Sequence, residues 1–131
     1  MMRSVGVLGL LLVAALPARA QNPACAAAQT QFEMNECAAR EYRKHDAEMN
    51  GVYNRLLARL ADAQQKSLLV EAERAWIAYR DRQCAFQTSG TVGGSIHPMI
   101  VSACLDEKTT VHSAELARQL DCKEGDPSCV H

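Results

Sequence analysis

Six cysteines are the residues of this chain with the clearest chemistry. All six follow an apolar leader over residues 1–20, and none lies within it. An even number of cysteines in an exported chain indicates disulfides, which persist in oxidising compartments and stabilise small domains with thin cores. Zinc would require closely paired ligands, such as two cysteines separated by two residues, and the sequence has no such pair. We therefore expect three disulfides and no metal.

The positions of the cysteines along the chain favour some disulfide pairings over others. Six cysteines allow fifteen connectivities, and sequence alone does not choose between them. The last two flank a Gly-Asp-Pro turn, the middle two fall at one level of an expected helical hairpin, and the first two lie on either side of a helix start. The pairs that we favour are Cys25 with Cys37, Cys84 with Cys104, and Cys122 with Cys129.

The other reactive side chains have no catalytic arrangement. Glu71 and Glu73 lie two positions apart on an expected helix and point to different sides, which favours solvated surface charges over an acid–base pair. The sequence has no G-x-S-x-G motif, and its four histidines lack metal-ligand spacing. We therefore predict that the chain is not an enzyme, with no catalytic residue and no cofactor.

A cluster around the single tryptophan is the first candidate for binding. It has the sequence Trp76-x-x-Tyr79-Arg80-Asp81. Aromatic residues at helical spacing favour a core aromatic pair, here with a structural ion pair beside it. The other reading is an interaction face, because Trp, Tyr and Arg are frequent interface anchors.

A Gly-rich segment over residues 88–95, TSGTVGGS, is the second candidate. Its glycines end a helix and permit positive backbone angles. The segment lacks the Lys-Ser/Thr ending of a P-loop and follows an expected helix, so it is not expected to bind phosphate. With the neighbouring positions it forms the 90–98 loop, our preferred contact surface. The candidate partner-binding residues are Arg80, Arg82, Gly93, Gly94, Ser95 and His97.

Long helices must position these groups. Thr30-x-x-Glu33 is a capping box, and the apolar residues that follow recur every seven positions to about Ala63, which predicts a long amphipathic helix. A polar joint at residues 64–67 follows, and Ser67 is the expected N-cap of a second helix. A joint that short makes the two helices antiparallel.

The second helix is expected to end near Phe86. After the Gly-rich turn, Ser95 is the expected cap of a third helix, with Pro98 in its first turn and its end near Leu120. No stretch alternates as a strand would. The sequence therefore predicts an all-α fold, a three-helix antiparallel bundle or hairpin stapled by disulfides. The inward face of the second helix is predicted from residues at steps of three or four: Leu69, Ala72, Trp76, Tyr79, Gln83 and Phe86.

The leader is typical of a secretory signal peptide. Arg3 precedes an apolar stretch over residues 5–16, and Ala18-Arg19-Ala20 forms a small-x-small cleavage site. The apolar stretch is too short for a stable membrane span, and no lipidation motif precedes Cys25. We expect cleavage after Ala20, a periplasmic or secreted location, and no membrane span in the mature chain.

The remaining 111 residues carry 12 basic and 15 acidic side chains, a net charge of −3. This balance argues against nucleic acid as the main partner, because phosphate binding requires a concentrated basic face. It is compatible with a basic protein partner. The length suits one domain with a modest core. We expect a helical domain at residues 21–121 and a cysteine-closed tail at residues 122–131.

Short motifs over residues 25–120 resemble a known family. They are Cys25-x4-Thr30-Gln31-x-Glu33-Met34-Asn35-x-Cys37, then Tyr42, Asp46, Asn50 and Tyr53, then Arg74-Ala75-Trp76-x-x-Tyr79-Arg80-Asp81-x-x-Cys84, then Gly93-Gly94-Ser95-x-x-Pro98, Cys104 and Thr109. Together they resemble the lysozyme-inhibitor LprI N-terminal family of small exported bacterial proteins, most of them uncharacterised. The family is named after a mycobacterial lipoprotein that inhibits lysozyme. The resemblance implies no catalytic residues.

Two functional hypotheses follow. The resemblance implies an exported inhibitor of a lysozyme-type muramidase. Such enzymes work through two carboxylates in a cleft, which an inserted loop would block. We expect this loop to be the 90–98 loop, flanked by Arg80 and Arg82. The alternative is a structural or accessory domain of the cell envelope, with a buried Trp76 cluster and no affinity for lysozyme. The oligomeric state has no signature in the sequence.

Overall fold

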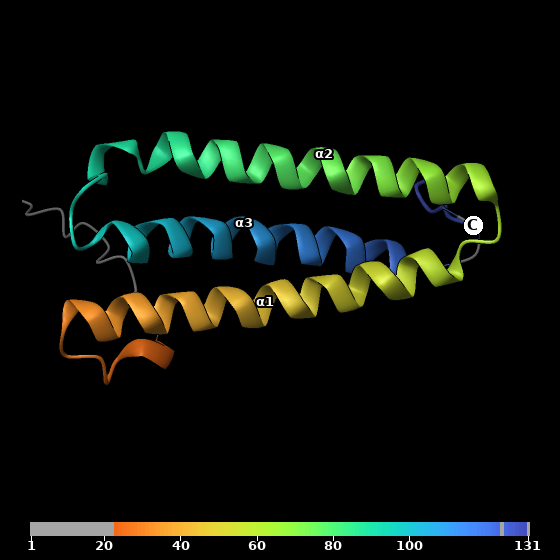
Figure 1. Cartoon of the computed structure of the whole chain (residues 1–131). Helices are drawn as coiled ribbons and strands as arrows, with labels where there is room; N and C mark the ends of the chain where they lie inside the picture. Colours follow the sequence, from red (N-terminus) through yellow and green to blue (C-terminus); the bar gives the residue numbers. More distant parts are fainter. Residues whose placement is uncertain (1–22, 124, 131) are drawn as a thin grey trace, which may run out of the picture.

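The structure, a computed structural model, describes residues 23–123 and 125–130 (Figure 1). These residues form helices and turns and no strand, which confirms the predicted all-α, three-helix fold. The predicted signal peptide at residues 1–20 lies outside the described residues. No helix within the described part of the chain combines the length and apolar character needed to cross a membrane. In chain order the elements are η1 (Pro23–Cys25), α1 (Gln31–Arg59), α2 (Ala63–Gln87), η2 (Ser89–Thr91) and α3 (His97–Leu120).

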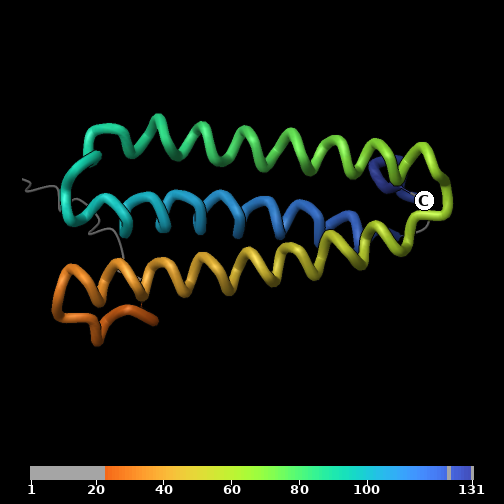
Figure 2. Tube along the Cα trace, viewed as in Figure 1, coloured from red at the N-terminus to blue at the C-terminus, as the bar shows by residue number. Residues whose placement is uncertain are grey.

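The three long helices lie side by side, with α2 antiparallel to both α1 and α3 (Figure 1). Most of the close backbone contacts join α1 to α3, whereas α2 makes few with α3 and almost none with α1. The trace in Figure 2 shows the same spacing. Since the backbone of α2 stands off from the other two, long side chains and a disulfide must hold it in place.

The predicted capping box at the start of α1 is confirmed. The Thr30 hydroxyl accepts a hydrogen bond from the Glu33 backbone N–H at 3.2 Å. The Glu33 carboxylate accepts from the backbone N–H groups of Thr30 at 3.0 Å and Gln29 at 2.8 Å. These backbone hydrogen bonds, with that of the Thr30 side chain, hold the pKa of Glu33 below its ordinary value of 4.5.

The lowered pKa of Glu33 predicts a pH-dependent contribution to stability. Its ionised carboxylate accepts bonds that the protonated form accepts less well, so the contribution is complete above pH 4.5 and is lost as the pH falls through the lowered pKa. We expect Glu33→Gln to lower the urea midpoint at pH 7. The difference from the parent chain should shrink as the solution is acidified. A difference that stays constant down to the acid limit would contradict this account.

The joint between α1 and α2 differs from the prediction. Helix α1 ends at Arg59, not near Ala63, and the joint is residues 60–62. The Asp62 carboxylate caps α2 by accepting from the Gln65 backbone N–H at 2.8 Å. The predicted joint at residues 64–67 and the predicted cap at Ser67 were wrong, because Asp62 is an equally good N-cap and lies about one and a half turns earlier.

The start of α3 was only partly predicted. Pro98 lies in its first turn, as expected, but Ser95 is not the N-cap. The N-cap position belongs to Ile96, which has no side-chain capping bond. Ser95 is used in another way, since its carbonyl accepts from the Asn35 side chain at 3.0 Å and fastens the loop to α1. The predicted end at Leu120 is confirmed.

The apolar core is small and lies mainly between α1 and α3. Met49, Leu56 and Leu116 form its buried centre. The half-buried residues packed against this centre are Val52, Tyr53, Leu69, Trp76 and Leu120. Few large apolar side chains are fully enclosed, so polar links and disulfides have a large share in holding the bundle together.

Helix α2 is turned by about one residue from its predicted orientation. Its buried positions are Glu73, Arg80 and Cys84, so the prediction that Glu73 is a solvated surface charge was wrong. Trp76 is half-buried, but Tyr79 is 57% exposed, so the predicted core aromatic pair does not form. The residues wrongly predicted to face inward are Ala72, Tyr79 and Phe86.

All three predicted disulfides are confirmed. Cys25–Cys37 joins the entry segment to α1, Cys84–Cys104 joins α2 to α3, and Cys122–Cys129 closes the tail. Their Cα–Cα distances are 5.8, 5.7 and 5.6 Å respectively. The middle bridge is the covalent link that holds α2 against the other helices.

Candidate functional site

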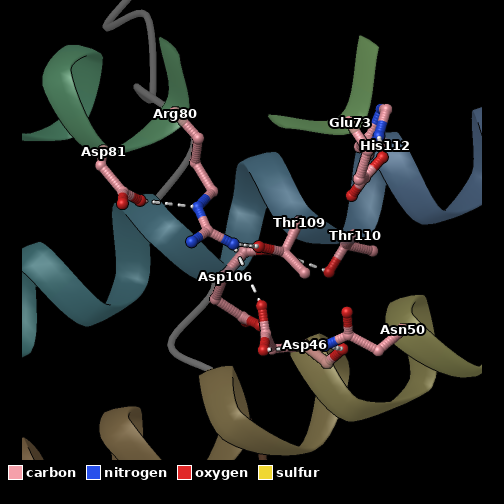
Figure 3. Close-up of polar contacts among 9 residues, drawn as sticks. All are labelled: Asp46, Asn50, Glu73, Arg80, Asp81, Asp106, Thr109, Thr110 and His112. Carbon is pink, nitrogen blue, oxygen red and sulfur yellow. Dashed lines mark hydrogen bonds and ion pairs between the residues drawn. The ribbon is translucent and has the colours of Figure 1, made fainter. Parts of the chain in front are cut away.

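One buried arginine links the three helices (Figure 3). Arg80 of α2 is 6% exposed. Its Nη1 donates to Asp46 Oδ1 on α1 at 3.0 Å and to Thr109 Oγ1 on α3 at 3.3 Å, and its Nε donates to Asp81 Oδ1 at 2.9 Å. The predicted structural ion pair is therefore present, and it reaches α1 as well as Asp81.

Aromatic rings enclose the same guanidinium. Its central carbon lies 5.2 Å from the centroid of the Trp76 ring and 5.6 Å from that of Tyr42, within range of cation–π attraction. Burial lowers the pKa of Arg80, but hydrogen bonds and charge, first from Asp81, outweigh it, and the pKa lies above the ordinary value. Burial raises the pKa of the Tyr42 phenol, and Arg80 offsets only part of this rise. Arg80 therefore stays charged while it holds the helices together.

Two histidines make further polar links between helices. His112 Nε2 of α3 lies 2.7 Å from the buried Glu73 carboxylate of α2, and its ring stacks on Trp76 at 3.9 Å between centroids. His45 Nδ1 of α1 lies 2.5 Å from Asp106 Oδ1 of α3. Within the described residues, the second oxygen of Glu73 is buried without a hydrogen-bond partner. Each pair of helices is thus joined by at least one polar link.

The 90–98 loop is held by its own hydrogen bonds. The Thr91 hydroxyl donates to the Thr88 carbonyl at 2.8 Å, so it accepts from His97 Nδ1, also at 2.8 Å. The Gly94 N–H donates to the Thr91 carbonyl at 3.0 Å. Gly93 has φ 83°, in the left-handed region that favours glycine. These bonds fix the loop in one shape while its tip stays exposed.

A cleft of about 450 Å³ lies between this loop and the helices. Arg80, Asp81 and Tyr42 supply polar groups to it, and His97 lines the side next to the loop. The remaining lining residues are Cys84, Ala85, Thr88, Val92, Val101 and Leu105. The Arg80 cluster therefore forms one side of the cleft, and the loop forms another.

The structure brings together most of the predicted partner-binding residues. Gly93, Gly94 and Ser95 lie exposed in the loop, and His97 lines the cleft together with Arg80. The bonds of Arg80 to Asp46 and Asp81 hold its side chain within the bundle. Arg82 lies apart from the other five residues. It follows Arg80 by two positions on α2, so its side chain is exposed on the outer side of the helix.

The polar contacts between helices were not predicted from the sequence. Asp46 and Thr109, which bond to Arg80, and His112, which pairs with Glu73, lie on other helices than their partners. Periodicity within one helix does not show which positions of two helices meet. One signal was present. Six residues of the motifs that carry the family resemblance meet in this cluster: Tyr42, Asp46, Trp76, Arg80, Asp81 and Thr109.

Comparison with known proteins identifies the family of the chain. The family model described as Lysozyme inhibitor LprI matches residues 22–116. The chain belongs to the LprI family. An uncharacterized protein of Rhizobium meliloti (strain 1021) is 40% identical over 132 aligned positions, which cover 89% of this chain and 94% of that protein. No solved structure matches the chain.

The match to the LprI family includes the site. The Arg80 cluster, the cleft and the 90–98 loop all lie within the matched residues, whereas the Cys122–Cys129 tail lies beyond them. The family is described as one of lysozyme inhibitors. The family and the three disulfides are both consistent with an exported protein.

Proposed function

We propose that this LprI-family protein is an exported inhibitor of lysozyme-type muramidases and that it binds them through the 90–98 loop. Residues 1–20 act as the signal peptide, residues 21–121 form the binding domain, and residues 122–131 form a closed tail. The observation that carries the proposal is the match of residues 22–116 to a lysozyme-inhibitor family, with an exposed, internally bonded loop inside the matched region.

The loop has the features that an inhibitory segment requires. Muramidases use two carboxylates in an open cleft, so a blocking segment must be narrow and must offer hydrogen-bond donors. The tip combines Val92, which is 71% exposed, with Gly93 and Gly94, which add little width. The exposed Ser95 hydroxyl is a donor for a carboxylate. A loop already held in one conformation loses little conformational entropy on binding.

The charge of the mature chain favours the same partner. With residues 1–20 removed, the net charge is −3, which attracts a basic enzyme and raises the rate of association. In this complex Arg80 keeps the base of the loop in position without a direct contact. Arg82, exposed on the outer side of α2, lies outside this contact.

The test is the lysis of peptidoglycan by a c-type lysozyme, titrated with the oxidised protein purified after export. Stoichiometric inhibition is expected. Val92→Asp should weaken inhibition by about tenfold, because a carboxylate on the loop tip meets the carboxylates of the enzyme cleft. Ala61→Asp is the matched control, since it adds the same charge to an exposed position at the opposite end of the bundle.

Two outcomes would overturn the proposal. The first is no inhibition at high molar excess of a chain whose circular dichroism is helical. The second is inhibition that Val92→Asp and Ala61→Asp weaken equally, because the contact would then lie outside the loop. The non-inhibitory envelope domain would become the better description after the first outcome.

A further inference from the structure

The outer side of α2 carries a continuous exposed stripe. Another helix touches it at Tyr79, where Lys108 Nζ of α3 lies 5.7 Å from the centroid of the ring. The positions of the stripe advance by alternating steps of four and three residues, and every one of them is exposed. Leu68 and Tyr79 are each 57% exposed, and Phe86 is 74% exposed. We call these positions the outer stripe. Its members are Leu68, Ala72, Ala75, Tyr79, Arg82 and Phe86.

This arrangement departs from that of an ordinary surface helix, although Leu69 and Trp76 of α2 still pack against the core. Helix α2 buries Glu73 and Arg80 and exposes aromatic and aliphatic side chains. Alternating steps of three and four are the spacing by which two helices pack along a seam. The outer stripe extends for about 27 Å along the helix axis, since each residue adds about 1.5 Å. Ala78 and Ala85, exposed beside the stripe, leave room for a second backbone.

We propose that the outer stripe is the interface of an antiparallel homodimer, in which α2 packs against α2 of a second copy. A two-fold axis near the middle of the stripe places Leu68 opposite Phe86 of the second copy. The same axis places Ala75 opposite Tyr79. Ala72 then lies opposite Arg82, so the two alanines face large side chains while Leu68 packs against Phe86. The same surface faces itself across the axis, as a two-fold interface requires.

Two charged side chains, one at the edge of the stripe and one within it, favour the antiparallel orientation of the two helices. Glu71 lies at its edge and Arg82 within it, and both are exposed. In the antiparallel pair, Glu71 of each copy lies next to Arg82 of the other, which gives two ion pairs. A parallel pair in register would instead place Arg82 against Arg82. Within one chain the two residues lie about 16 Å apart along the axis and cannot pair.

This inference is independent of the proposed inhibition. The stripe lies on the outer side of α2, and the antiparallel pair places the two 90–98 loops at opposite ends of the dimer, where each stays free. Sedimentation equilibrium of the exported, oxidised chain over a range of concentrations is the first test. A monomer–dimer equilibrium is expected. Ala75→Glu, which places a charge at the centre of the seam, should leave a helical monomer.

Charge reversal tests the orientation. Glu71→Arg and Arg82→Glu should each weaken the dimer by about tenfold, because each turns two attractive contacts per dimer into repulsive ones. The double variant should restore the parent affinity. Arg40→Glu, an exposed reversal on α1, is the matched control and should leave the dimer unchanged.

Three results would overturn the inference. One is a chain that stays monomeric at the highest soluble concentration. This result would overturn the dimer even if the outer stripe were found to bind lysozyme. Another is a dimer that Ala75→Glu leaves intact, and the third is a double reversal that fails to restore affinity. If Ala75→Glu does not fold, the single and double reversals at exposed positions still decide the question. None of these readouts involves lysozyme, so failure here is distinct from failure of the inhibitor proposal.

Discussion

We expect Arg80→Ala to lower the free energy of unfolding by about 3 kcal/mol, whereas Arg82→Ala, two residues along the same helix, should change it by less than about 0.5 kcal/mol. The two substitutions remove the same side chain. They differ in position, because Arg80 is 6% exposed at the meeting point of three helices and Arg82 lies on the surface. The comparison therefore isolates the effect of the interhelical cluster from any general loss of positive charge.

The expected loss has three sources. Thr109 is fully buried, and without Arg80 it loses the donor to its hydroxyl oxygen. Asp46 loses its cationic partner, and a cavity opens between Trp76 and Tyr42. Breaking a fully buried ion pair costs about 3–5 kcal/mol. The lower end applies because the side chain of Asp46 is 32% exposed, so water screens part of the interaction.

Urea denaturation followed by circular dichroism measures both variants at low protein concentration, where association through α2 has no influence. Arg80→Lys is the informative third variant. It retains the charge but not the planar fork that reaches Asp46, Asp81 and Thr109 together, so it should recover only part of the stability. If Arg80→Ala were within about 1 kcal/mol of the parent, the cluster would not be what holds α2 in place.

Removal of the Cys84–Cys104 bridge is the second large effect. The paired substitutions Cys84→Ala and Cys104→Ala should cost about 3 kcal/mol, since a bridge that spans 20 residues restricts the unfolded chain strongly. The same treatment of Cys122–Cys129, which spans 7 residues, should cost about 1 kcal/mol less. Helix α2 has few close backbone contacts, so the middle bridge also has the larger role in the folded state.

Hydrogen exchange measures where this loss occurs. Without Cys84–Cys104, the amides of the C-terminal half of α2 and of the 90–98 loop should exchange faster, while those of α1 retain most of their protection. The variant lacking Cys122–Cys129 is the control, because its bridge lies at the other end of α3. Equal loss of protection in all three helices would show that the bundle unfolds as one unit and that the bridge does not hold α2 specifically.

Features with strong local signals could be predicted from the sequence. The capping box at Thr30 and Glu33 satisfies backbone donors within four residues, so its effect depends little on the rest of the fold. The disulfides were predictable because each joins positions that a simple hairpin or turn already brings together. The joint at residues 60–62 was missed because two good capping residues, Asp62 and Ser67, lie within one and a half turns of each other.

The orientation of α2 could not be predicted, because the helix is apolar on two sides. One set of apolar positions contains Leu69 and Trp76, and another contains Tyr79 and Phe86. Periodicity alone does not say which set faces the core. The structure shows that Arg80 and Glu73 complete the inner face, and their burial depends on Asp46 and His112 from other helices. The loop residues of the site were identified from their composition, but the cluster beneath them requires the fold.

The order of the disulfides along the chain has a consequence for biogenesis. The first cysteine bonds to the second, the third to the fourth, and the fifth to the sixth, and no bridge encloses another. An oxidant that joins cysteines in the order in which they emerge therefore produces the native set directly. Maturation then needs no slow reshuffling of wrong pairs by an isomerase, and the supply of oxidant determines how fast a newly made chain is completed.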